Sequence, residues 1–392
     1  MTKYSKQDLN LVLDNYYNSA KIPMTSEYLK SKITEFAKIS SGTNNYESLY
    51  PYTAIWKINS DCNLRCKHCY FYGSEKYSTK NDLSFDEICN VINQISELGI
   101  AEIRLTGGEV FLHKDIFRII KFIKAKGLSV IITTNGTLIT NKLAKDLSKI
   151  INPYVDIVRV SLDGATSATH DITRGTGVFE KAINSIKLLK QNNIKVFVPS
   201  VITSKNVNEL ADLYNFLNKI KVNQLTLTKI VPMNFSQNDL IPSFEDLIYN
   251  SARMYEQIKD TDFITVDNRL FTSYNFLQDE NAKKLLYKFA ELNTRKEFNL
   301  ECHCNPDKSF YIDADGTVYL CPLAADYKVE PLGNLKQESL EELFKKRKKN
   351  KLFKKQDRHN KKCKNCKIFS LCNSGCIMKA YLKNGKFESL PC

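Results

Sequence analysis

The stretch TAIWKINSDCNLRCKHC (53–69) joins an apolar, β-branched segment to three closely spaced cysteines. Cys62, Cys66 and Cys69 lie within eight residues, and the next cysteine along the chain is Cys89. A structural zinc site is closed by four ligands, so three thiols leave one position to be filled. The spacing leaves three interpretations open: a zinc site with a remote fourth ligand, a redox pair with a spare thiol, or a metal site with an open coordination position.

The segment 53–59 is the first of several apolar, β-branched segments that alternate with helical patterns. The strand candidates are 53–59, 102–106, 128–134, 155–162, 195–202 and 223–230. Apolar residues at helical spacing occupy 84–98, 115–126, 141–150, 178–192, 207–220 and 244–258. Continuous apolar strands are typical of a parallel sheet. The pattern predicts an α/β fold with a partial (β/α)6 barrel of the TIM type over 51–258, and the cysteines then lie at its catalytic, C-terminal face.

Composition narrows the class of protein. The opening MTKYSKQDLN has no apolar signal segment, and no run of roughly 18 apolar residues occurs anywhere. We therefore expect a cytoplasmic protein without a membrane segment. Twelve cysteines in such a chain favour metal ligation over disulfides, because a reducing compartment keeps thiols free.

The formal net charge of +14 fits a lysine-rich solvated surface, an acidic peptide partner or nucleic acid. The densest basic run, 345–362, lacks the interleaved aromatic residues of a single-strand binder, so nucleic acid is an unlikely partner.

Small polar loops follow three of the predicted strands. TGGEV (106–110), TTNGT (133–137) and SLDG (161–164) would converge on the barrel face that carries the cysteines. Such loops expose backbone groups and suit a polar small molecule lying across the strand ends. An iron–sulfur cluster held by three thiolates would leave one iron for that molecule. The open coordination position would then be the functional feature of the site.

The spacing Cys62-x-x-x-Cys66-x-x-Cys69, with the aromatic His68 before the last cysteine, resembles the signature of the radical S-adenosylmethionine (SAM) superfamily. The resemblance covers residues from about 52 to 230. It implies a 4Fe–4S cluster whose open iron chelates SAM. An external one-electron reductant, such as flavodoxin or ferredoxin, would reduce the cluster. SAM would then be cleaved to a 5′-deoxyadenosyl radical that abstracts hydrogen from a substrate.

The same resemblance implies the residues that contact SAM. The backbone of the glycine-rich loop and Glu109 would receive the methionine amino group, and Val110 stands where proline is common. Ser161 and Asp163 would lie near the ribose or the carboxylate, and Arg174 is a further candidate for the carboxylate. The implied cofactor-binding residues are His68, Gly107, Gly108, Glu109, Ser161, Asp163 and Arg174.

Eight of the cysteines lie in the last part of the chain, and their pattern resembles the SPASM domain, which carries two auxiliary 4Fe–4S clusters. The resemblance implies one cluster on Cys302, Cys304, Cys321 and Cys376, and a second on Cys363, Cys366, Cys372 and Cys392. Cys302 and Cys304 are unusually close for two ligands of one cluster. If only one of them binds, the first cluster has an open iron. A zinc ribbon is the alternative.

These patterns divide the chain into four parts: a helical extension over 1–50, the barrel over 51–258, a helical bridge over 259–300 and the SPASM domain over 301–392. The resemblance implies an enzyme whose substrate is most often a peptide or protein. Our leading hypothesis is a thioether or carbon–carbon crosslink in a ribosomally made precursor peptide, whose acidic leader a basic surface would attract. Alternatives are tetrapyrrole or other cofactor biosynthesis, formylglycine formation in sulfatases and, remotely, a metal-binding nucleic-acid protein.

Overall fold

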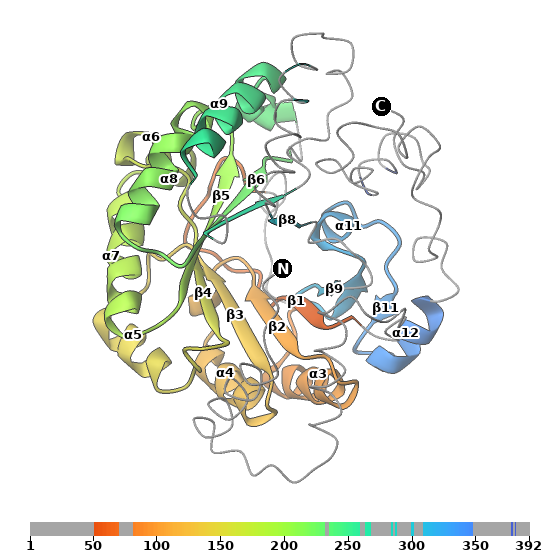
Figure 1. Cartoon of the computed structure of the whole chain (residues 1–392). Helices are drawn as coiled ribbons and strands as arrows, with labels where there is room; N and C mark the ends of the chain where they lie inside the picture. Colours follow the sequence, from red (N-terminus) through yellow and green to blue (C-terminus); the bar gives the residue numbers. More distant parts are fainter. Residues whose placement is uncertain are drawn as a thin grey trace, which may run out of the picture.

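The structure, a computed structural model, describes residues 51–69, 81–231, 235–258, 263–267, 284, 287, 299–301, 309–347, 378 and 381. Its strands form one sheet of eleven in the order β11-β10-β9-β1-β2-β3-β4-β5-β6-β7-β8 (Figure 1). All pairs from β9 through β1 to β8 are parallel, and β10 and β11 are antiparallel additions. The strands are β1 (Thr53–Lys57), β2 (Glu102–Thr106), β3 (Ser129–Thr134), β4 (Ile157–Val160), β5 (Val196–Ile202), β6 (Gln224–Lys229), β7 (Ile264–Asp267), β8 (Asn299–Glu301), β9 (Ser309–Ile312), β10 (Thr317–Tyr319) and β11 (Gly333–Asn334).

Helices cover the outer face of this curved sheet (Figure 1). The described α-helices are α3 (Phe85–Glu97), α4 (Ile116–Ala125), α5 (Asn141–Ser148), α6 (Ser167–Arg174), α7 (Val178–Gln191), α8 (Leu210–Lys219), α9 (Phe244–Gln257), α11 (Pro322–Asp326) and α12 (Leu340–Arg347). Short 3-10 turns are η1 (Val110–Leu112), η2 (Val207–Glu209) and η3 (Phe235–Leu240). The six predicted strands and six predicted helices of the barrel are confirmed, and with them the α/β fold. No helix in the described parts is both long and apolar enough to cross a bilayer.

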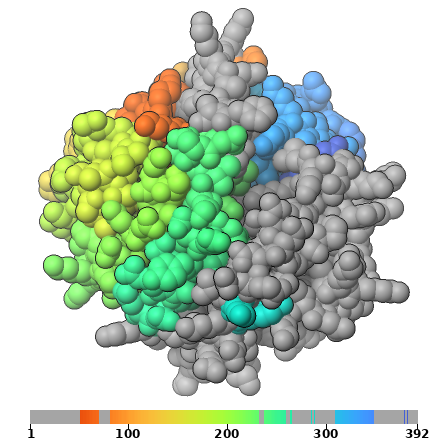
Figure 2. All heavy atoms as spheres, turned by 90° about the horizontal axis from the view of Figure 1, so that it is seen from above, coloured from red at the N-terminus to blue at the C-terminus, as the bar shows by residue number. Residues whose placement is uncertain are grey.

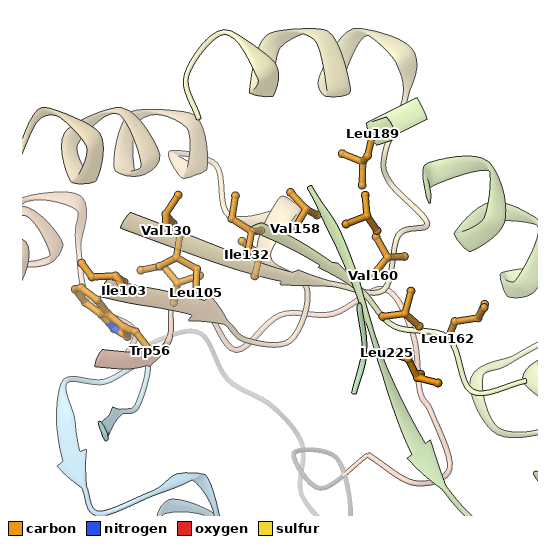
Figure 3. Close-up of a cluster of buried hydrophobic side chains, with 14 of the residues drawn as sticks. Trp56, Ile103, Leu105, Val130, Ile132, Val158, Val160, Leu162, Leu189 and Leu225 are labelled. Carbon is orange, nitrogen blue, oxygen red and sulfur yellow. The ribbon is translucent and has the colours of Figure 1, made fainter. Parts of the chain in front are cut away.

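The core lies between the strands and the outer helices. Alternate residues of β2, β3 and β4 point toward the helices and are fully buried, as Ile103, Leu105, Val130 and Val158 illustrate (Figure 3). The residues between them face the interior of the barrel, because side chains along a strand alternate between its two faces. The side chains on the helix-facing side of each strand thus form the barrel core, and those on the inward-facing side are available to form the site.

The structure contains one barrel helix that the sequence pattern did not predict. Helix α6 begins after Thr166, whose side chain accepts a hydrogen bond from the backbone N–H of Thr169 at 3.3 Å. It ends at Gly175, whose φ of 113° lies in a region that favours glycine. The helix carries Arg174 in its last turn, and this placement brings that residue back toward the cysteine loop.

The segment 259–300 was expected to be a helical bridge, and its described residues include both helix and strand. Lys284 and Tyr287 are helical, whereas strand β7 lies within the segment and β8 begins at its end, and both strands extend the parallel sheet. The sheet also joins the C-terminal segment to the barrel, because β9 pairs with β1 in parallel, with Ile55 opposite Tyr311. Viewed from above, the described C-terminal residues, in blue, lie to one side of the yellow and green barrel residues (Figure 2). The expected extension over 1–50 lies outside the described residues.

Candidate active site

The three cysteines of the opening motif follow β1 in a loop that lines a cavity of about 320 Å³. Cys62, Cys66 and Cys69 are partly buried, none is in a disulfide, and all three contribute to the wall of this cavity. The loop lies at the C-terminal ends of the barrel strands, which is where the sequence placed it. The structure therefore gathers the three predicted ligands around one space.

Two distant segments hold the backbone of this loop. The N–H of Lys67 donates to the carbonyl of Thr173 on α6 at 2.8 Å. The side-chain amide of Gln237, on η3, donates to the carbonyls of Lys67 at 2.9 Å and of Cys69 at 3.3 Å. Gln237 is buried, so these hydrogen bonds are shielded from water. The barrel thus fixes the course of the cysteine loop from two sides.

The three thiols share one cavity wall, and such a set can bind an iron–sulfur cluster. In a four-iron cluster each thiolate binds a different iron, so the thiols surround a larger volume. Burial raises the pKa of the Cys66 thiol, which the Arg174 guanidinium lowers, and ligation removes its proton outright. Three cysteines on a shared cavity wall therefore fit a 4Fe–4S cluster with one iron left open.

The glycine-rich loop after β2 lies against the residues that lead into the cysteine loop. A Cβ atom on Gly107 would meet Asn59 Oδ1 at 2.5 Å and the Asn59 carbonyl at 2.8 Å. The N–H of Gly108 donates to that same carbonyl at 3.0 Å, and the N–H of Glu109 donates to the Asp61 carbonyl at 2.6 Å. Only glycine permits so close an approach. Gly107 and Gly108 both line the cavity.

Glu109 is not part of the described wall of the cavity, although its partners Thr134 and Asn135 are. It accepts hydrogen bonds from Thr134 Oγ1 at 2.6 Å and from the N–H groups of Asn135 at 2.8 Å and Phe111 at 3.2 Å. Burial raises the pKa of Glu109, and these three hydrogen bonds oppose the rise. The carboxylate fastens the loop after β3 to the glycine-rich loop. The predicted contact with the methionine amino group stays a prediction, and the geometry favours the backbone of the loop for it.

A buried ion pair lies behind the cysteine loop. Asp163 Oδ2 accepts from Arg174 Nε at 2.5 Å and lies 3.4 Å from His68 Nε2, and its Oδ1 accepts from the N–H of Val201 at 2.8 Å. Burial opposes ionisation of Asp163, but the charge and hydrogen bond of Arg174, together with His68 and His170, outweigh burial and hold the pKa of the carboxyl well below its usual range. Burial lowers the pKa of His68 to about 4, so this imidazole is neutral at pH 7. Arg174 and His68 line the cavity, whereas Asp163 lies outside its described wall and orients them.

Ser161 completes the set of predicted SAM contacts. It follows β4, its N–H donates to the carbonyl of Thr134 at 3.0 Å, and it lines the cavity. Of the seven residues predicted from the resemblance, the structure places five on the cavity wall: His68, Gly107, Gly108, Ser161 and Arg174. Their contacts with SAM remain predictions.

Four further charged residues on the cavity wall escaped the sequence analysis: Arg104, Arg159, Lys229 and Asp326. The first three belong to β2, β4 and β6, and Arg104 Nε donates to Glu102 Oε1 at 2.7 Å. A signal was present in EIRLT (102–106) and in IVRV (157–160), since an arginine in a buried strand needs a polar interior. Asp326 ends α11 in the C-terminal segment, and nothing local to its sequence indicated that it would reach the barrel cavity.

Cys321 is the described member of the predicted auxiliary-cluster ligands. It is buried at the start of α11 in an apolar cluster with Tyr311, Tyr319, Leu323 and Met378. Burial of this kind shields an iron–sulfur cluster from water and influences its potential. The other predicted ligands lie outside the described residues: Cys302, Cys304, Cys363, Cys366, Cys372, Cys376 and Cys392. Their assignment stays a prediction.

Comparison with protein-family models finds two matches in this chain. Residues 56–217 match the radical SAM superfamily, and residues 302–367 match SPASM, an iron–sulfur cluster-binding domain. The first match contains the cysteine loop and every cavity residue contributed by β2 to β5. The second contains Cys321 and Asp326.

Among curated proteins, the chain is 24% identical to Fe-coproporphyrin III synthase of Methanosarcina barkeri over 345 residues, which cover 83% of each protein. It is 25% identical to the mycofactocin maturase MftC of Mycolicibacterium smegmatis, over 87% of this chain and 80% of that protein. Among solved structures, SuiB of Streptococcus suis bound to its precursor peptide SuiA matches with a TM-score of 0.65 and 15% identity. That match covers 94% of this chain and 80% of SuiB, and at this identity it supports the fold alone.

Proposed function

Because the chain belongs to the radical SAM superfamily and carries a SPASM domain, we propose that it forms a thioether or carbon–carbon crosslink in a ribosomally made precursor peptide. SAM bound at a reduced 4Fe–4S cluster would supply a carbon radical able to remove a hydrogen atom from the substrate. The electron comes from an external one-electron donor such as flavodoxin or ferredoxin. The SPASM domain binds auxiliary iron–sulfur clusters, and its helix α11 contributes Asp326 to the cavity wall.

The two-sided wall of the cavity carries the proposal. Its volume of about 320 Å³ is near the lower end of the roughly 300–1,000 Å³ that small-molecule sites occupy. SAM is itself a ligand of that size, so a substrate would have to reach it from the edge of the cavity. One wall belongs to the barrel, and α11 of the C-terminal segment supplies another. A peptide segment can lie between the two and insert a single residue.

The residues of the chain bind and orient the reactants. Cys62, Cys66 and Cys69, which line the cavity, would hold the cluster. The backbone of Gly107 and Gly108 offers polar groups to the methionine end of SAM. The Ser161 hydroxyl and the Arg174 guanidinium are suited to its ribose and carboxylate. Asp163 and Glu109 keep these groups in place through the buried hydrogen bonds described above. A cavity that excludes water protects the radical from side reactions.

Relatives of both substrate classes exist. The similarity to the mycofactocin maturase and the fold shared with SuiB, which was solved with a precursor peptide, support the peptide proposal. A tetrapyrrole-modifying activity is the second candidate, because Fe-coproporphyrin III synthase matches over most of both proteins. The cationic side chains of Arg104, Arg159 and Lys229 would suit the carboxylate groups of such a ligand.

The two candidates are separated by direct assay. The protein is purified without oxygen, reconstituted with iron and sulfide, and incubated with SAM and a reductant. Synthetic peptides encoded by small genes next to this one are compared with coproporphyrin-type tetrapyrroles. We expect a neighbouring peptide to lose two hydrogen atoms per crosslink, detected by mass spectrometry, while the tetrapyrroles remain unchanged. Unchanged masses for every peptide, together with consumption of a tetrapyrrole, would favour the second candidate and end the first.

A further inference from the structure

Helix α11 places one acidic side chain on the cavity wall. The helix begins after Cys321 with Pro322 at its first position, and the N–H of Ala325 donates to the Cys321 carbonyl at 3.2 Å. Pro322 and Asp326 are four residues apart and so share one helix face, and both line the cavity. Ala324 and Ala325 are buried in the apolar cluster around Cys321. The helix is thus fixed by its apolar side and presents Asp326 to the cavity.

The Asp326 carboxylate makes no hydrogen bond or ion pair with another of the described residues. The positive charge of Lys57, on β1, lowers the pKa of Asp326. The Lys57 ammonium group, however, forms an ion pair with Asp313 at 3.0 Å. Most other buried carboxylates near this cavity are fully engaged, as Glu109 and Asp163 show. Among the described residues that line the cavity, Asp326 is the one carboxylate. A partly buried carboxylate to which the described residues offer no partner is costly and is typical of a group that interacts with a ligand.

The surroundings of Asp326 raise the pKa of its carboxyl group into the physiological pH range. Burial and the nearby negative charge of Asp313 raise the pKa of Asp326 to about 8, and Lys57 partly opposes the rise. The cationic groups that face the cavity from the barrel are Arg104, Arg159, Arg174 and Lys229. The other ionisable groups close by on the C-terminal side are Tyr319 and Tyr327, whose pKa values are raised by burial. A group whose pKa lies this close to neutral pH can both accept and release a proton under physiological conditions.

We propose that Asp326 is the general base of this enzyme and takes a proton from the substrate at the C-terminal wall of the cavity. The step is a proton transfer alone: an X–H bond of the substrate breaks, its electron pair stays on X, and an O–H bond forms on the carboxylate. X is the thiol sulfur in a thioether-forming peptide, or the corresponding heteroatom of another substrate. The assignment of X rests on the proposed function. The assignment of Asp326 rests on the cavity.

Other groups on the wall are less suited to this role. The His68 imidazole is held against Asp163, and with a pKa of about 4 it is a weak base. The Arg174 guanidinium keeps its proton, because the Asp163 charge raises its pKa against the effect of burial. The cysteines are committed to the cluster. Asp326 also lies on the same short helix as Cys321, so proton uptake would occur next to a predicted auxiliary-cluster ligand.

The test compares Asp326→Asn and Asp326→Glu with Asp212→Asn, which alters an exposed aspartate on α8. Far-UV circular dichroism and iron content show whether each variant is folded and loaded. With the substrate, we expect Asp326→Asn to lower kcat about a hundredfold or more at unchanged KM, a loss typical of a missing general base. SAM cleavage measured as 5′-deoxyadenosine should fall far less than product formation. The wild-type rate should rise with pH through an inflection near the pKa of the carboxyl, and Asp326→Asn should lose that inflection. Asp326→Glu should keep it.

A kcat within about twofold of the wild type, or a raised KM with unchanged kcat, would show that Asp326 is not the base. If neither peptides nor tetrapyrroles react with the wild type, the proposed function fails, and a second measurement still decides the role of Asp326. Difference infrared spectra should contain a protonated-carboxyl band that disappears as the pH rises through about 8 and is absent from Asp326→Asn. A wild-type spectrum without such a band would overturn the proposal.

Discussion

Two aspartates near the cavity have pKa values that their environments shift in opposite directions. Asp163, after β4, is fully buried but has Arg174, His68 and a backbone N–H around its oxygens, and its pKa lies well below the usual range. Asp326, on α11, is also shielded from water, but no described residue hydrogen-bonds to it, and its pKa is raised to about 8. The first therefore stays ionised at every physiological pH. The second changes its protonation state in the working range.

The difference separates a positioning role from a reactive one. A carboxylate that already accepts several hydrogen bonds from the protein has few lone pairs available for a ligand. It positions the protein groups that donate to it. A carboxylate that the fold shields and leaves unpartnered is costly to keep, so a role in chemistry is the simplest reason for its presence. The barrel side of the cavity is thus preorganised, and the C-terminal side carries the group that can exchange a proton.

The largest effect is expected from removing a predicted ligand of the SAM-binding cluster, because both the barrel side and the C-terminal side of the cavity depend on SAM cleavage. Cys66→Ala deletes one of the three thiols around the cavity, so SAM cleavage should fall to the background level of the reductant alone, with the fold and the auxiliary clusters retained. The measurement is 5′-deoxyadenosine by liquid chromatography, with Cys89→Ala on α3 as the control. Wild-type yields of 5′-deoxyadenosine from Cys66→Ala would refute the assignment of this site.

Breaking the ion pair at Asp163 should destabilise the barrel. Arg174→Met leaves a buried, uncompensated carboxylate, which typically costs about 3–5 kcal/mol. Denaturant unfolding of the reconstituted protein measures this loss, and Arg118→Ala is the control, because its ion pair with Asp115 is largely exposed on the arginine side. Exposed pairs contribute about 0–1 kcal/mol. A loss of under about 1 kcal/mol for Arg174→Met would mean that water or relaxation compensates Asp163.

A smaller loss is expected at Glu109, whose carboxylate only accepts hydrogen bonds. In Glu109→Gln the new amide N–H₂ faces donors that the carboxylate had satisfied. This should cost about 1–3 kcal/mol of unfolding free energy and weaken SAM binding through the shifted loop. Glu97→Gln, at an exposed position on α3, serves as the control. Equal stability of the two variants would show that the hydrogen bonds of Glu109 are dispensable.

The smallest effect concerns the pH dependence of stability. The pKa of Asp326 is higher in the folded protein than in the unfolded chain, so the folded state binds the extra proton. Its stabilising contribution is complete below the unfolded pKa of about 4 and is lost as the pH rises through about 8. Asp326→Asn should therefore melt a few degrees above the wild type at about pH 9, and the advantage should shrink at lower pH. A constant difference across this range would contradict the raised pKa.

The sequence predicted the barrel and the cysteine loop because both depend on local patterns. The apolar, β-branched segments that alternate with helical patterns and the spacing of Cys62, Cys66 and Cys69 are visible without tertiary information. The role of the Glu109 carboxylate was harder to predict, because its partners lie on the next strand. Asp326 could not be predicted from local pattern at all. It reaches the cavity because β9 pairs with β1 across more than two hundred residues of chain.

The most direct test of the account is whether SAM binds at the cluster of the three-cysteine loop. Electron paramagnetic resonance of the reduced protein is recorded with and without SAM, for the wild type and for the triple variant Cys62→Ala, Cys66→Ala and Cys69→Ala. The account predicts that SAM changes one cluster signal of the wild type. It also predicts that the triple variant lacks that signal, keeps the auxiliary signals unaffected by SAM, and forms no 5′-deoxyadenosine. A triple variant that still responds to SAM and cleaves it would contradict the account.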